Sequence, residues 1–447
     1  MNSLYKYILN LFGLDNLVLF SLSAKILQGF GLIALLFAVT IFLDEIERGF
    51  YFSFISFAAL QIFFELGIGV VIIQHTARLI VSFGGNLENL KQNSQFYDFK
   101  NIVGIFQFNF VWTTAAGILL FLIIYPLGLI FFNNLSESSL VSWRVEWLFL
   151  IASVAIFLPL SAQLSFFEGG GYLKEVLKLR IFTSLTSYIS AIICLILGLK
   201  LFAVSAIFIS QILVILIWIV SKKINIYKIL LSKNPSLNSL KKWFFTLLPM
   251  QWKISVSWIC GYLAFQSATP FTQSYLGAKA AGELGLFLNI SNMLVGFIGA
   301  WMSTKIPKFS LMIENKKLSD LNILFAETSK KSSLVFLICS IMMFYAFTFY
   351  IDIVSYEYVS VLNIIILLVI SALSSISYAQ AVYLRCFLQE LFMISSIVYA
   401  LLIVINIPIF VPTYGINGLS FIYLFSGIIS TFMTTMIFIK FKKNIIL

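Results

Sequence analysis

The chain has little charge, little histidine and little cysteine for its length. Of its 447 residues, 11% are charged, one is histidine and four are cysteine. A soluble domain carries about 25% charged residues, so this chain could not cover a folded core with polar surface. The single histidine excludes a multi-histidine metal centre. The cysteines fall in apolar runs without paired spacing and indicate neither a disulfide framework nor a metal site. No cofactor is expected.

The sequence consists largely of long apolar runs that carry almost no charge. Hydrophobic residues make up 61% of the chain, and a helix needs about 20 apolar residues to cross a hydrocarbon core of about 30 Å. The first run is too long for the hydrophobic region of a signal peptide, so we expect it to be a first span. We predict an all-α polytopic membrane protein with twelve spans. They cover residues 17–42, 49–74, 102–132, 147–167, 179–199, 202–221, 246–271, 284–306, 333–350, 358–380, 391–411 and 417–439.

Lysine and arginine concentrate in alternate connectors between these spans. An even number of spans places both termini on one side, and the segments on that side hold twenty-four of the twenty-nine basic residues. The other side holds four, and Lys25 lies within the first span. Positive charge marks the cytoplasmic side of a membrane protein, so both termini are predicted to be cytoplasmic. Topology and attraction to anionic membrane lipids then explain the net charge of +11, and no nucleic-acid partner is expected.

The longest polar connector divides the chain into two halves of six spans. A shift of 236 residues brings Glu47 onto Glu283 and Gly49 onto Gly285, so an acidic residue and a glycine open the second span of each half. Identity between the halves is very low, and coincidence among apolar helices is the alternative to a true repeat. The predicted domains are an N-terminal lobe, 1–221, a connector, 222–245, and a C-terminal lobe, 246–447.

Polar and aromatic side chains recur on one face of the seventh predicted span. Such a face is unfavourable against lipid, so we predict that it lines a lumen, where its amides, hydroxyls and aromatic rings bind a substrate. Hydrogen bonding between helices of one lobe is the alternative. The substrate-binding candidates on this face are Gln251, Ser255, Trp258, Tyr262, Gln266 and Gln273. Asn292 on the eighth span is a lesser candidate.

Two charged residues fall inside the first and second predicted spans. Lys25 and Glu65 each lie about ten residues from the inner end of their span, which is ~15 Å of helix. Charges inside a membrane are rare and face protein or water. In a structural interpretation, the two residues form a buried ion pair that fixes helix packing. In a functional interpretation, Lys25 is an anion site and Glu65 is an ion-coupling group. The two interpretations are compatible. Gln28 and Gln61, on the same helix faces, are further substrate-binding candidates.

A family resemblance is carried by three segments: the acidic turn before Gly49, the run FELGIGVVIIQ at 64–74, and FEGGGYLKEVLKLR at 167–180. With the span number and the midpoint connector, they resemble the O-antigen flippases (Wzx type) of the multidrug/oligosaccharidyl-lipid/polysaccharide (MOP) exporter superfamily. The resemblance implies two six-helix lobes in a V-shaped, MATE-like fold. It also implies alternating-access transport of an undecaprenyl-pyrophosphate-linked oligosaccharide across the bacterial inner membrane. Membrane lipids, a polysaccharide polymerase and a chain-length regulator are the candidate partners.

Two other functions stay open. A MATE-like antiporter of drug cations belongs to the same superfamily, and an O-antigen polymerase also spans the membrane many times. The polymerase is disfavoured because the predicted outer loops are short and the chain has no Ser-His-Asp arrangement. The glycine run at 169–171 lacks the Lys-Ser/Thr that follows in a phosphate loop. We therefore expect a transporter and not an enzyme.

Overall fold

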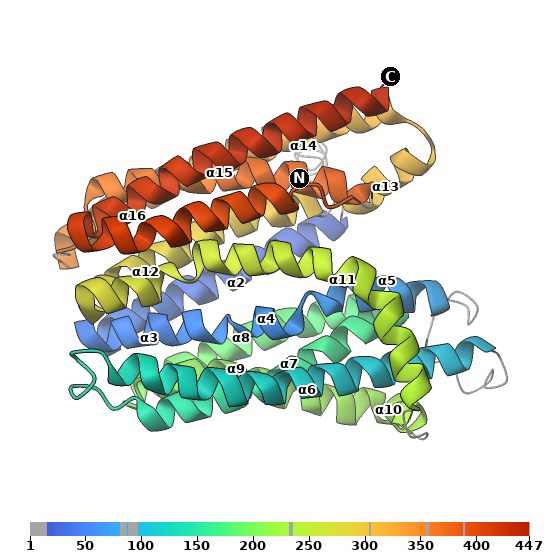
Figure 1. Ribbon diagram of the computed structural model, residues 1–447, viewed down its shortest axis with the longest axis horizontal. Helices are drawn as coiled ribbons and strands as arrows, with labels where there is room; N and C mark the ends of the chain where they lie inside the picture. The colour runs from blue at the N-terminus through green and yellow to red at the C-terminus, as the bar shows by residue number, and fades with distance from the viewer. Residues whose placement is uncertain are drawn as a thin grey trace, which may run out of the picture. The chain divides into compact units, whose positions relative to one another are not determined.

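The computed structural model describes residues 16–80, 87, 97–231, 236–303, 305–354, 357–387 and 389–446, and these form helices joined by short turns (Figure 1). The prediction of an all-helical chain is confirmed for this described part. Six of its continuous helical segments are long and apolar enough to cross a membrane. They are Phe99–Asn133, Arg144–Ile196, Phe202–Leu231, Leu318–Phe349, Val361–Cys386 and Met393–Asn444. The count of twelve spans stays a prediction.

The chain divides into two compact units. The first unit comprises residues 34–270, and the second comprises residues 271–447 together with residues 1–33. Helix α2 (Asn16–Phe42) contributes residues to both. The two six-span lobes expected from the sequence stay a prediction.

The first unit is a helical bundle in which α6 packs on α7, α8 packs on α9, and α7 also packs on α9 (Figure 1). Its elements are α3 (Glu45–Ala58), α4 (Gln61–Glu65), α5 (Ile68–Ile80), α6 (Tyr97–Asn133), α7 (Arg144–Phe167), the π-helical turn η3 (Glu168–Tyr172), α8 (Leu173–Ile196), α9 (Phe202–Trp218), the π-helical turn η4 (Ile219–Lys223), α10 (Ile224–Leu231) and α11 (Leu237–Phe265).

Aromatic side chains fill this bundle at both ends of α7. At its start, the fully buried Trp147 contacts the rings of Phe54 and Phe132, with 5.2 Å between centroids in each pair. A Cβ at Gly128 would lie 2.0 Å from the Trp147 ring, so only glycine leaves room for the indole. At the end of α7, Phe167 lies edge-on to Trp218 at 5.4 Å. Edge-to-face aromatic packing of this kind adds stability beyond the buried area alone.

The second unit contains α12 (Ala268–Ser303), α13 (Ile306–Glu314), α14 (Leu318–Val354), α15 (Val361–Cys386) and α16 (Met393–Ile446). Gly277 (φ 86°, ψ 173°) interrupts α12, and Gly415 (φ 60°, ψ −145°) interrupts α16. Each is therefore two helices in succession, since glycine adopts a positive φ that other residues avoid. Side-chain bonds hold α15 to α16, among them Gln380 Nε2 to Thr435 Oγ1 at 3.1 Å.

The two glutamates paired by the internal sequence shift are both buried, and each holds a connector of its own unit. Glu47 forms an ion pair with Lys200, in the turn between α8 and α9. This hydrogen bond raises the pKa of Lys200 above its usual value. Glu283 accepts hydrogen bonds from the backbone N–H groups of residues 357, 358 and 359, at 3.1, 2.8 and 3.0 Å, just before α15. In each half of the chain, the glutamate at the start of the second predicted span thus holds a neighbouring turn in place.

Candidate substrate site

The second predicted span, 49–74, is not one helix. Turns at residues 59–60 and at Leu66–Gly67 divide it into α3, α4 and α5. Leu66 and Gly67 have φ angles of 52° and 65°, a left-handed region that costs a residue with a side chain about 1–2 kcal/mol. A Cβ at Gly67 would lie 2.6 Å from Cγ2 of Ile254. The prediction of a continuous helix is wrong here because hydropathy does not report where the backbone hydrogen-bond ladder stops.

Helix α11 packs along this broken segment and supplies hydroxyls to backbone carbonyls. The last four carbonyls of any helix have no partner within it. Tyr262 donates its hydroxyl to the carbonyl of Ser56 in the last turn of α3, at 3.0 Å. The Ser255 hydroxyl lies 2.9 Å from the carbonyl of Leu66, at the second break, and 2.7 Å from that of Gln251. These bonds stabilise the interruption, so the break is a built feature of the first unit.

Glu65 is the last residue of α4 and stands at the break. A Cβ built on Gly69, in the first turn of α5, would lie 3.5 Å from Glu65 Oε1 and 2.9 Å from Ser165 Oγ. The carboxylate therefore lies beside the start of α5, where the helix dipole favours negative charge. The backbone of Lys25 lies on α2, but its side chain is outside what the structure describes. The Lys25–Glu65 pair stays a prediction.

Several amide side chains of the first unit have a buried polar atom with no hydrogen-bond partner among the described residues. Gln163 on α7 is fully buried, and neither of its side-chain polar atoms is bonded. Asn109 on α6 donates to the carbonyl of Ala162 at 3.0 Å, but its Oδ1 has no partner. Gln61 Oε1 and Gln251 Nε2 are likewise unbonded. An unpaired buried amide costs about 1–3 kcal/mol, so these groups are positioned for water, an ion or a polar ligand.

The sequence-predicted residues divide between the two units. Gln61, Glu65, Gln251, Ser255 and Tyr262 come together in the first unit, where α4 packs on α11. Ser255 and Tyr262 bond carbonyls of the second predicted span. These bonds run between helices, but the second and seventh spans are assigned to different predicted lobes, so they are not the bonds within one lobe that the alternative interpretation expects. The sequence reasoning missed two buried amides of this unit, and the signal for each is a polar side chain inside an apolar run. They are Asn109 and Gln163.

The polar and aromatic face predicted for the seventh span is shorter than expected. Helix α11 ends at Phe265, and Gln266, half-buried, follows as its cap. Gln273 lies on α12, so its predicted place on one continuous helical face with Gln251 is wrong. It is buried in the second unit, with both amide atoms unpaired within the described chain.

The other candidates show different degrees of burial. Trp258 on α11 is half-buried, as is Gln28 on α2, whereas Asn292 on α12 is exposed. Their roles in binding substrate stay predictions. Across the described ranges, no group of three or more His, Cys, Asp or Glu side chains is placed to hold a metal ion.

The fold is that of known transporters. It matches a mutant of the MATE transporter VcmN from Vibrio cholerae with a TM-score of 0.61 and 14% identity, over 96% of each chain. It matches the lipid II flippase MurJ, in an inward closed conformation, with a TM-score of 0.60 and 16% identity, over 97% of this chain and 91% of that one. An inward-facing multidrug resistance MATE transporter of the MOP superfamily aligns with a TM-score of 0.56 and 14% identity, over 89% of this chain and 94% of the other.

No protein-family model matches the chain, and no curated protein matches it by sequence. At identities this low, the likeness shows the fold and not the substrate. The described part of the chain is all-helical and shares its fold with transporters of the MOP superfamily. MATE transporters and the lipid II flippase are equally close to it.

Proposed function

We propose that this chain flips an undecaprenyl-pyrophosphate-linked oligosaccharide, the repeat unit of O-antigen or a similar polysaccharide, from the cytoplasmic to the periplasmic face of the inner membrane. The Wzx-type sequence resemblance supports this substrate, and a lipid II flippase is among the structures that share the fold. Alternating access is the mechanism that the resemblance implies.

The observation that carries the proposal is the helix break beside buried, unpaired amides. Transporters of several folds bind their substrates where membrane helices are discontinuous, because the interrupted backbone leaves polar groups to meet the ligand. Here Leu66 and Gly67 break the helix next to Glu65, and Gln61 and Gln251 present unbonded amide atoms within the same unit. Amides offer both donors and acceptors, which suits the hydroxyls of a sugar.

Each residue has a role in the proposed cycle. The amides of Gln61, Gln163 and Gln251 bind sugar hydroxyls, and Lys25 attracts the pyrophosphate. Glu65 exchanges a proton or another cation as the site changes its access. The lipid tail stays in the bilayer while the head group crosses, and a polymerase with its chain-length regulator then receives the repeat unit.

A second candidate function is antiport of an organic cation, as the MATE structures suggest. One specific observation favours it. Glu65 lies two residues after Phe63 on α4, and the ring of Phe63 meets that of Tyr262 edge-on with 5.1 Å between centroids. Carboxylates and aromatic faces both attract positive charge, so a short helix that carries both suits a cationic ligand. An O-antigen polymerase is a third and less favoured candidate function.

Deleting the gene distinguishes these functions. We expect loss of the surface polymer and accumulation of single lipid-linked repeat units at the cytoplasmic face of the inner membrane. Repeat units that reach the outside but stay unpolymerised would identify a polymerase. Normal polysaccharide, together with new sensitivity to cationic dyes, would identify a drug antiporter and overturn the proposal.

A further inference from the structure

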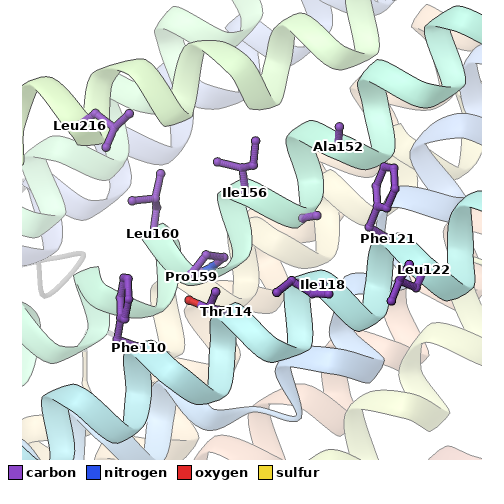
Figure 2. A pocket seen from close by; sticks show the side chains of 12 residues that line it. Phe110, Thr114, Ile118, Phe121, Leu122, Ala152, Ile156, Pro159, Leu160 and Leu216 are labelled. Atoms are coloured by element: carbon purple, nitrogen blue, oxygen red, sulfur yellow. The ribbon is translucent and has the colours of Figure 1, made fainter. Parts of the chain in front are cut away.

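A groove of about 520 Å³ runs between α6, α7 and α9 of the first unit (Figure 2). Small residues make the space, since Gly117 on α6 and Ala152 and Ala155 on α7 line it without filling it. Large apolar side chains border it, among them Phe121 and Leu216. Its volume falls within the ~300–1,000 Å³ of typical ligand pockets. Gln163, Glu65 and the other residues of the candidate substrate site do not line it.

Backbone geometry keeps the groove open. A Cβ at Gly117 would lie 2.4 Å from the carbonyl oxygen of Ala155, so the backbones of α6 and α7 meet closely at this point. Pro159 has no N–H, and the carbonyl four residues before it, that of Ala155, therefore loses its helical partner. A side chain at position 117 would therefore push the two helices apart, and glycine is needed for this crossing beside the groove.

The groove is continuous with the apolar outer surface of membrane-length helices. Ile118, Leu122 and Ile156 line it with side chains 57%, 61% and 55% exposed. All three helices that form it belong to the segments long and apolar enough to span a membrane. Thr114 is the sole polar side chain among the twelve that line it, and its hydroxyl is buried. A charged or sugar-like ligand would find no partners there, whereas hydrocarbon would lose no polar interactions.

We infer that the groove holds one acyl chain of a bilayer phospholipid. The lining residues of α6 extend from Phe110 to Leu122, a rise of twelve residues. At 1.5 Å per residue the groove is therefore ~18 Å long. That is a little over half of the ~30 Å hydrocarbon core, and so it matches the chains of one leaflet. An undecaprenyl chain is several times longer than the groove. The inference goes beyond the proposed function and does not depend on it.

Photolabelling of the full chain tests this occupant. The protein is placed in vesicles of phosphatidylethanolamine and phosphatidylglycerol, part of the former carrying a diazirine midway along one acyl chain. We expect peptides containing Ile118, Ile156 and Leu216 to be labelled most strongly. Ala152→Phe fills the groove and lowers this labelling at least fivefold. Ala115→Phe adds the same ring at an exposed position of α6 outside the lining, and it leaves the labelling unchanged.

Three outcomes would overturn the inference. In the first, labelling is no stronger in the groove than at exposed apolar positions elsewhere, such as Leu337 on α14. In the second, a folded Ala152→Phe protein, or Ala152→Leu if the larger ring prevents folding, keeps full labelling. In the third, photoreactive undecaprenyl phosphate labels the groove and displaces the phospholipid at equal concentration, which would make the occupant the polyprenyl chain. Transport is not measured, so failure of the flippase proposal would leave this test intact.

Discussion

A buried amide without a hydrogen-bond partner lowers the stability of the folded protein, so its presence calls for an explanation. Gln163 is fully buried on α7 with both polar atoms unbonded, whereas Gln107 on α6, almost as buried, donates to the carbonyl of Leu230 at 3.2 Å. The same residue type therefore occurs once satisfied and once unsatisfied in one bundle. Under the proposed function, Gln107 serves packing and Gln163 serves the ligand, and this contrast can be tested.

We predict opposite effects of replacing these two glutamines with leucine. Gln163→Leu removes an unsatisfied amide, so stability in detergent should stay equal or rise by about 1–3 kcal/mol. Transport, measured as surface polysaccharide restored to the deletion strain, should fall at least tenfold. Gln107→Leu should lower stability by about 1 kcal/mol and leave transport nearly normal. A Gln163→Leu protein that is stable and fully active would remove Gln163 from the site.

Only some of the site could be predicted from individual residues. Glu65 is conspicuous in the sequence because a carboxylate in an apolar run needs an explanation. Tyr262 follows from helical phase, although its hydroxyl bonds the carbonyl of Ser56 on the second predicted span and so contributes to helix packing. Asn109 and Gln163 were missed, since one or two amides in a long span are common and whether each has a partner depends on the packed neighbours.

At the scale of elements, hydropathy predicted where helices lie better than where they break. The apolar run around Leu66 continues through the break, so its composition gives no warning of it. Gly67 is the local signal, but glycine is also ordinary inside membrane helices. The break requires Ser255, almost two hundred residues later, to bond the free carbonyl, and such a partner cannot be read from a local pattern.

Gly67→Ala tests whether this break is built into the fold. The new Cβ meets Ile254 Cγ2 at 2.6 Å, which adds an overpacking cost of about 1–3 kcal/mol to the cost of the left-handed backbone. We expect a lower melting temperature in detergent. Ile254→Ala in the same chain removes the clash, so the double variant should be about 1–3 kcal/mol more stable than the sum of the single effects. Gly261→Ala, with no atom within 4 Å, serves as the control. Additive single effects would show that the two helices do not meet as described.

A second prediction at the scale of elements concerns Glu283. Its carboxylate, 4% exposed, receives the three backbone N–H groups before α15. Glu283→Ala leaves these donors without an acceptor and should cost about 3 kcal/mol. Glu357→Ala removes only the ion pair with Lys279, in which the glutamate is 62% exposed, and should cost under about 1 kcal/mol. Equal melting temperatures for the two variants would show that the connector does not depend on Glu283.

At the scale of the whole molecule, composition alone predicted an all-helical membrane protein, because so apolar a chain has few other folded states. The substrate is a different matter. Multidrug resistance transporters and a lipid II flippase share this fold at 13–16% identity, so the fold does not distinguish between these functions. Function is determined by a few side chains at the site, and their placement required the three-dimensional structure.

The coupling role of Glu65 makes a prediction about the whole transport cycle. If its carboxylate exchanges a proton or another cation as access alternates, Glu65→Gln should still allow downhill exchange of substrate in vesicles. It should lose accumulation driven by an imposed ion gradient, because an amide does not take up the charge that links the two movements. Exchange and gradient-driven transport of a lipid-linked oligosaccharide are therefore measured in the same vesicles. If Glu65 serves only to pack α4 against α5, the substitution should lower the melting temperature and reduce both activities together.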